Sequence, residues 1–171
     1  MQYLIGNFAT NTTAAAVKVA TSTSLKTMLQ VKGIIPFKVV EWGWSGDASA
    51  AATPGVVELI ETGTVAATSL TAIATADITR YDGDAVAFGD PVSTVITVGT
   101  GATGFNTSGG AEGSITAVRN LAGPQQIAST NQFVQQFPLG YRPFVPATAY
   151  LRIRNIFGTS VNALCYVIIE F

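Results

Sequence analysis

The chain has no histidine and a single cysteine among its 171 residues, and only 11% of its residues are charged. Histidine is the side chain most often used for proton transfer near neutral pH, and it is also the commonest metal ligand. Cys165, being alone, cannot form an intrachain disulfide, a cysteine-rich zinc site or a Cys-His nucleophile pair. We therefore predict that the chain is not an enzyme and uses no cofactor.

The charges are also balanced, with nine Lys and Arg against ten Asp and Glu. Proteins that bind nucleic acid or anionic lipid gain affinity from clustered basic residues, which this chain lacks. Its longest apolar runs, such as residues 166–169, are far shorter than the roughly 20 residues of a membrane helix. The first residues lack the basic segment followed by an apolar segment that is typical of a signal peptide. We expect neither nucleic acid nor membrane as a partner, and no export.

Apolar and polar residues alternate with a period of two along much of the chain, which is the pattern of β-strands. A helical period is nearly absent beyond residues 13–20. The pattern predicts an all-β fold, a single-domain antiparallel β-sandwich with jelly-roll-like winding over residues 14–171. The strands are expected within residues 24–32, 37–44, 56–62, 91–98, 114–119, 132–137, 149–156 and 161–171, and the last two are expected to form a hairpin.

The same alternation predicts which side chains are buried. Lys26 and Gln30 are placed on the solvent face of their strand, whereas Cys165 is placed on the core face of the last one. Trp42 and Trp44 stand two residues apart and therefore share a face. We expect both tryptophans to be buried in the core, with an exposed sugar-stacking platform as the alternative.

Two segments do not fit the strand pattern. Residues 1–13 carry Tyr3, Leu4, Ile5 and Phe8 outside any clear strand, and they are predicted to form an arm that lies on a neighbouring subunit. Residues 99–113 carry six glycines and are predicted to form an exposed glycine-rich loop.

Residues 99–104 match the pattern GxGxxG directly after a predicted strand. A dinucleotide site also needs a following helix and an acidic residue about 20 positions later, and both are missing. We therefore interpret these residues as part of the loop.

Carboxylates supply two further candidate sites. Asp77, Asp82, Asp84 and Asp90 cluster in sequence, but their spacing matches no EF-hand, so we interpret them as part of a solvated turn, with a cation site as the alternative. Glu41, with Glu58 or Glu61, is the only strand carboxylate pair that could serve glycoside hydrolysis, and no other motif supports it.

A later segment mixes apolar side chains, neutral hydrogen-bonding groups and one arginine. Such a mixture is typical of protein interfaces, whose centres are poor in charge and rich in aromatics and arginine. Ordinary core and loop residues are the alternative reading. The candidate interface residues here are Gln135, Gln136, Phe137, Leu139, Tyr141, Arg142 and Phe144.

Three stretches read together carry a resemblance to a known group. They are residues 39–50 (VVEWGWSGDASA) with 57–64 (VELIETGT), residues 137–143 (FPLGYRP), and residues 151–154 (LRIR) with 166–170 (YVIIE). The pattern covers most of residues 25–171 and resembles the head decoration, or cement, proteins of tailed bacteriophages. That resemblance implies a homotrimer that binds the outer surface of the major capsid protein lattice, on a virion assembled in the host cytoplasm.

Two other functions stay open. The chain could be a tail or baseplate component of the same kind of virion. It could also be a carbohydrate-binding sandwich that uses Trp42 and Trp44.

Overall fold

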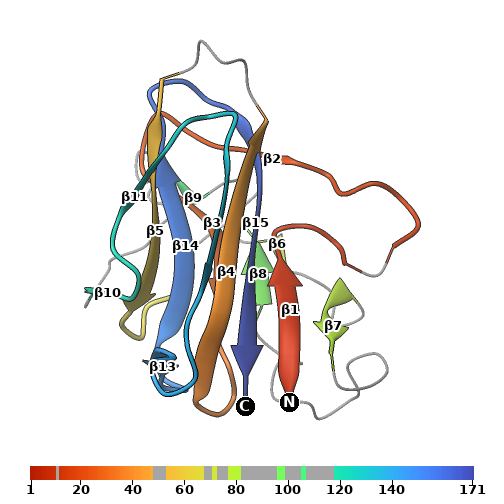
Figure 1. Cartoon of the computed structure of the whole chain (residues 1–171), viewed down its shortest axis with the longest axis vertical. Coiled ribbons are helices and arrows are strands. Elements are labelled where there is room, and N and C mark those ends of the chain that lie inside the picture. The colour runs from red at the N-terminus through yellow and green to blue at the C-terminus, as the bar shows by residue number, and fades with distance from the viewer. Residues whose placement is uncertain are drawn as a thin grey trace.

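The computed structural model describes residues 1–10, 12–47, 53–67, 71–72, 77–81, 96–98, 105–106 and 118–171. Within these residues the chain forms two antiparallel β-sheets and no α-helix (Figure 1). The sheets pack face to face, so the prediction of an all-β sandwich is confirmed. Apart from residues 105–106, the predicted glycine-rich loop and its GxGxxG motif lie outside the described residues.

The first sheet has the strand order β12-β4-β15-β1-β7. Two short strands extend it, since β13 pairs with β4 and β2 pairs with β15. The bounds are β1 (Gln2–Gly6), β2 (Val19–Ala20), β4 (Phe37–Asp47), β7 (Thr79–Arg80), β12 (Gln132–Gln136), β13 (Phe144–Val145) and β15 (Asn162–Glu170).

The second sheet has the strand order β10-β5-β14-β3-β8-β6. Here β11 pairs with β5, and β9 pairs with β3. The bounds are β3 (Lys26–Val31), β5 (Gly55–Thr62), β6 (Thr71–Ala72), β8 (Ile96–Val98), β9 (Phe105–Asn106), β10 (Val118–Asn120), β11 (Gln125–Ile127) and β14 (Tyr150–Ile156).

The strand pairs are nested along the chain. The first strand β1 pairs with the last strand β15, β3 pairs with β14, β4 with β12, and β5 with β10 and β11. The chain crosses between the sheets from β3 to β4, from β4 to β5 and from β14 to β15. The predicted hairpin of the last two strands is therefore wrong, because its connection through buried Phe157 passes from one sheet to the other.

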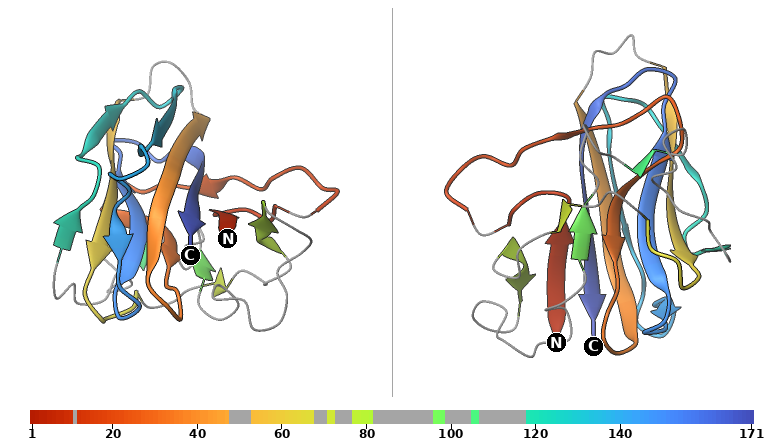
Figure 2. Two further views of the ribbon diagram at one scale, coloured as in Figure 1. Left: turned by 60° about the horizontal axis from the view of Figure 1, so that its bottom comes forward. Right: turned by 180° about the vertical axis from the view of Figure 1, so that it is seen from behind.

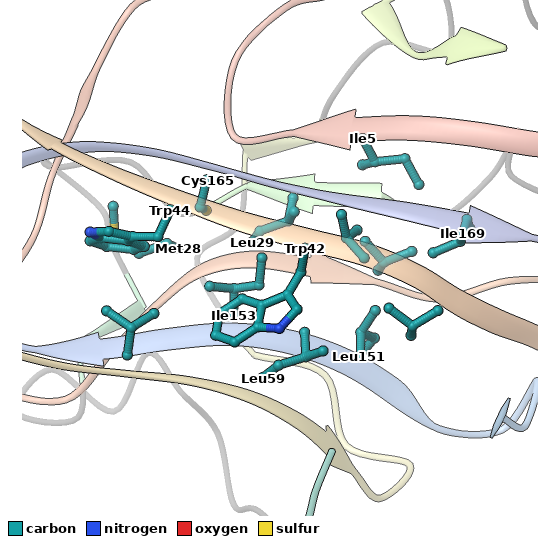
Figure 3. Packing of buried hydrophobic residues seen from close by; sticks show 14 of the residues in the cluster. Ile5, Met28, Leu29, Trp42, Trp44, Leu59, Leu151, Ile153, Cys165 and Ile169 are labelled. Carbon is teal, nitrogen blue, oxygen red and sulfur yellow. The ribbon is translucent and has the colours of Figure 1, made fainter. Parts of the chain in front are cut away.

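Apolar side chains from both sheets fill the space between them (Figure 3). Trp42 and Trp44 lie in this core, with 0% and 1% of their surfaces exposed. Trp42 packs edge to face against Phe133 with ring centroids 5.0 Å apart, and Trp44 stacks on Phe157 at 5.8 Å. The prediction of buried tryptophans is confirmed, and the sugar-stacking platform is wrong because neither ring reaches the surface.

A β-bulge in β4 puts the tryptophans inside. Val39 and Trp42 are both fully buried although they stand three residues apart, a spacing that strict alternation would put on opposite faces. Ile168 lies opposite Glu41 and Ile169 opposite Val39, so Val40 is the extra residue. A bulge of this kind inserts one residue and changes which face the following side chains occupy.

Strand β3 is buried on both faces, which corrects the prediction that Lys26 and Gln30 face solvent. Residues 63–67 explain the burial, because the N–H of Ala67 donates to the Gln30 side chain at 3.0 Å. Lys26 donates to the carbonyl of Ala20 at 2.5 Å, and burial lowers the pKa of its amine. Gln30, on the outer face of this sheet, thus binds the backbone of a covering segment. Lys26 lies on the inner face, because the register shift between β14 and β3 places it opposite Asn155, which in turn lies opposite the core residue Val57.

The predicted arm over residues 1–13 is wrong for Gln2–Gly6, which form β1 inside the first sheet. Strand β1 pairs with β15 over its whole length, and Tyr3 and Ile5 are fully buried on its inner face. The terminal amine also donates to the carbonyl of Phe171 at 3.1 Å. The described part of the segment between β1 and β2 does extend away from the sandwich (Figure 2).

Candidate functional site

Exposed apolar side chains gather at one end of the sandwich. Leu139 and Tyr141 are 83% and 82% exposed, and Ile34, Ile35 and Phe144 are about half exposed. Figure 1 shows this end with both chain termini, β13 and the connection from β3 to β4. We call these five residues the terminal surface. Single exposed apolar residues are ordinary, but a group of them marks a binding surface.

The backbone holds the terminal surface in place. Phe144 pairs with Lys38 where β13 joins β4, and the N–H of Val39 donates to the carbonyl of Pro143 at 2.9 Å. The N–H of Tyr141 closes a turn onto the carbonyl of Pro138 at 2.9 Å. Within this turn Gly140 has a φ of 97°, which side chains rarely allow. The exposed side chains therefore project from an ordered loop.

Two hollows lie among these residues and share the side chains Lys38 and Glu170. The larger holds about 320 Å³ and is also lined by Pro36, Phe37, Phe144 and Phe171. The smaller holds about 100 Å³ and is also lined by Leu139, Gly140 and Arg142. Arg142 forms an ion pair with Glu170 across the smaller hollow. The terminal surface thus combines apolar side chains with a few charged groups.

The predicted interface residues separate into two groups. Leu139, Tyr141 and Phe144 are exposed, and Arg142 reaches the same surface through its ion pair. Phe137 is instead buried in the core.

The glutamines face opposite ways. Gln135 turns inward, because its side-chain oxygen accepts a hydrogen bond from Trp42 Nε1 at 3.1 Å, whereas Gln136 faces solvent. Of the N-terminal candidates, Leu4 and Phe8 are half-buried and Tyr3 and Ile5 belong to the core. They do not form an exposed interface.

Sequence reasoning missed Ile34 and Ile35. They lie in the connection from β3 to β4, directly before Pro36. Two β-branched apolar residues beside a proline, between predicted strands, were the available signal, because a tight turn normally carries polar residues.

Tyr166 and Glu41 form a polar contact on the outer face of the first sheet. The Tyr166 hydroxyl donates to Glu41 Oε1 at 2.6 Å. Burial, the hydrogen bond to Glu41 and the negative charge of Glu41 all raise the pKa of Tyr166. Burial and the charge of Glu41 also raise the pKa of Tyr81. The two phenols therefore lose their protons only at a higher pH than an ordinary tyrosine does.

The carboxylate candidates do not meet. Glu41 lies on the first sheet, whereas Glu58 lies on the second and accepts a hydrogen bond from Arg154 at 2.7 Å. Glu61 pairs with Arg119, also on the second sheet. Glu41 and either partner therefore cannot flank one glycosidic bond.

Asp82, Asp84 and Asp90 lie outside the described residues, so only Asp77 of the four aspartates considered as cation ligands is placed. Among the described residues, no three His, Cys, Asp or Glu side chains gather where they could hold a metal ion. The described part of the chain contains no helix that is long and apolar enough to cross a membrane.

Comparison with known proteins identifies no relative of the chain. No family model matches the chain, and no curated protein or solved structure matches it.

Proposed function

We propose that this chain is a non-enzymatic structural protein of a tailed-bacteriophage virion, which binds the outer surface of the major capsid protein lattice as a homotrimer. The observation that carries the proposal is the terminal surface, whose most exposed residues, Leu139 and Tyr141, project from an ordered loop. A protein that stabilises a shell acts through contact area, and exposed aromatic and aliphatic side chains are the usual anchors of such contacts.

The fold supports this proposal at a coarser level. The nested pairs, from β1 with β15 inward to β5 with β10 and β11, are compatible with the jelly-roll-like winding that we propose for the chain. Jelly rolls occur in viral capsid proteins and in lectins. Because one fold hosts many functions, the proposal depends on the surface and on the resemblance of the three stretches within residues 25–171, read together, to head decoration proteins.

The polar groups of the terminal surface fit a contact that forms between folded proteins. Arg142 is already paired with Glu170, so it need not be desolvated as a lone charge when the surface is covered. Lys38 remains exposed between the two hollows and can meet an acidic group on the shell.

Binding to shells assembled from the major capsid protein of the same virus tests the proposal. The wild-type chain should co-sediment with shells, and Leu139→Ser and Tyr141→Ser should each weaken binding about tenfold, which corresponds to about 1.4 kcal/mol. Val17→Ser is the matched control, because Val17 is 77% exposed on the segment between β1 and β2.

Imaging with a labelled copy of the chain separates the possible locations. Label over the head supports the proposal, whereas label confined to the tail would replace it with the tail or baseplate function. Equal binding by the wild type and both serine variants would show that the terminal surface does not contact the shell.

A further inference from the structure

Strand β12 forms one edge of the first sheet, and among the described strands none lies beyond it. The N–H of Phe137 donates to the carbonyl of Val40, and the N–H of Gly46 donates to the carbonyl of Asn131. Together with the register of β12 on β4, these bonds show that the N–H and C=O groups of the odd-numbered residues point toward β4. The alternation of an antiparallel ladder then points the N–H and C=O groups of Gln132, Val134 and Gln136 away from β4. No described strand pairs with that side.

We propose that two copies of this chain pair through β12, antiparallel and about a two-fold axis at Val134, so that the first sheet continues from one molecule into the next. The inference does not depend on the proposed function. Its occupant is the β12 strand of a second copy.

Strand β12 lacks the features that usually protect a sheet edge. Natural edge strands carry lysine, proline, bulges or very short lengths, which prevent another chain from pairing. The segment Gln132-Phe-Val-Gln-Gln136 has no charge and no proline, and its register with β4 is regular. At the opposite edge of the same sheet, β7 has two residues and ends at Arg80. The protein thus blocks one edge and leaves the other able to pair.

The strand is also complementary to itself. An axis at Val134 places Val134 opposite its copy and Gln132 opposite Gln136 of the second molecule, so that all three outward-directed residues find partners. Each such pair exchanges two backbone hydrogen bonds, which gives about six between the chains. The side chains of these three residues are exposed on the outer face of the sheet, where valine meets valine and amide meets amide.

The core holds β12 in its pairing conformation. Phe133 packs against Trp42, and Gln135 accepts the hydrogen bond from the same ring. Because these inward side chains are already fixed, the strand loses little conformational freedom when a second copy binds. Such preorganisation favours association.

The native mass of the chain in solution tests the pairing. A lysine at Val134 places two positive charges opposite each other at the two-fold axis, so Val134→Lys should halve the native mass of the wild-type assembly. Each chain has a mass of 17.7 kDa. Val17→Lys makes the same change at an exposed valine elsewhere and should leave the mass unchanged. Circular dichroism checks that both variants keep their strands.

Engineered cysteines test the register. Cys165 is the only cysteine of the chain, and it is buried. Under mild oxidation Val134→Cys should give a disulfide-linked dimer, because the paired Cα atoms would lie about 5.5 Å apart. Gln132→Cys alone should not cross-link, since its two copies would be about 14 Å apart. A mixture of Gln132→Cys and Gln136→Cys should cross-link.

Each result decides the inference. Halving of the mass by Val134→Lys together with this cross-linking pattern supports the two-fold pair. A wild-type monomer, or a mass that Val134→Lys leaves unchanged, overturns it. Equal cross-linking by Val134→Cys and Gln132→Cys would also overturn it, because that pattern indicates random collision. If this edge instead binds a strand of a different protein, the purified wild-type chain would be a monomer and would form a complex only with that protein. That result would also overturn the inference.

Discussion

The ring of Tyr166 lies over Gly43, its partner across β15 and β4 on the outer face of the first sheet. A Cβ atom at Gly43 would be only 2.3 Å from Tyr166 Cε1, which is closer than real carbon atoms approach. In this position the ring brings its hydroxyl to Glu41, two residues from Gly43 along β4. The missing side chain of one residue therefore makes room for the aromatic side chain of the other.

Replacing Gly43 tests this packing. Gly43→Ala forces the Tyr166 ring off its position and should lower the free energy of unfolding by about 1–3 kcal/mol. Urea unfolding measures the loss. In a Tyr166→Ala background the added methyl group has space, so the same substitution should cost much less. An equal loss in both backgrounds would show that the ring is not the cause.

Tyr166 should also make the protein sensitive to alkali. Burial and Glu41 raise the pKa of this phenol above its ordinary value of 10.0, so the folded chain keeps a proton that the unfolded chain loses near that pH. The folded state then binds more protons, and stability falls as the pH rises above about 10. Tyr166→Phe should show a shallower fall between about pH 9 and pH 11. Tyr141→Phe, at an exposed tyrosine, should retain the wild-type slope.

Cys165 should report unfolding. Its side chain is fully buried, and burial raises the pKa of its thiol, so the reactive thiolate does not form in the folded chain. A thiol reagent should label the native protein only as fast as it unfolds, and at once in denaturant. The thiol of Val17→Cys, at a position that is 77% exposed, provides the fast-reacting control. Rapid labelling of native Cys165 would show that this part of the core opens locally.

Asn155 should be replaceable with a gain in stability. It lies in β14 with no exposed surface, and neither its side-chain nitrogen nor its side-chain oxygen has a hydrogen-bond partner among the described residues. Such buried groups cost about 1–3 kcal/mol each. Asn155→Val removes both unpaired polar atoms, and valine is favoured in β-strands, so the midpoint of urea unfolding should rise. A lower midpoint would mean that the amide supports the fold.

Most of the strands could be predicted from the sequence, because β-branched and aromatic residues alternate clearly in β4, β12, β14 and β15. The core face of β15 followed directly from that alternation, and Cys165 lies on it as predicted. These successes depend on local periodicity, which a strand displays whichever sheet it joins.

The failures concern contacts between distant parts of the chain. Strand β1 has only Tyr3 and Ile5 to mark its buried face, and its partner β15 lies at the far end of the sequence. The burial of Gln30 depends on residues 63–67, and the bulge at Val40 depends on the register with β15. None of these can be recognised within a short window of residues.

Part of the terminal surface could likewise be predicted, since Leu139, Tyr141 and Phe144 belong to one segment of mixed composition. Ile34 and Ile35 join them only because the connection from β3 to β4 ends at the same end of the sandwich. A surface assembled from two separated segments has no single sequence signal.

The hydrogen bond from the Met1 amine to the Phe171 carbonyl makes the molecule suitable for circular permutation. A linker of a few residues would join β15 to β1 as a hairpin, and new ends could be opened in the exposed segment at residues 12–17. Such a permutant would carry fused cargo away from the terminal surface, whereas cargo on the present ends would emerge beside it.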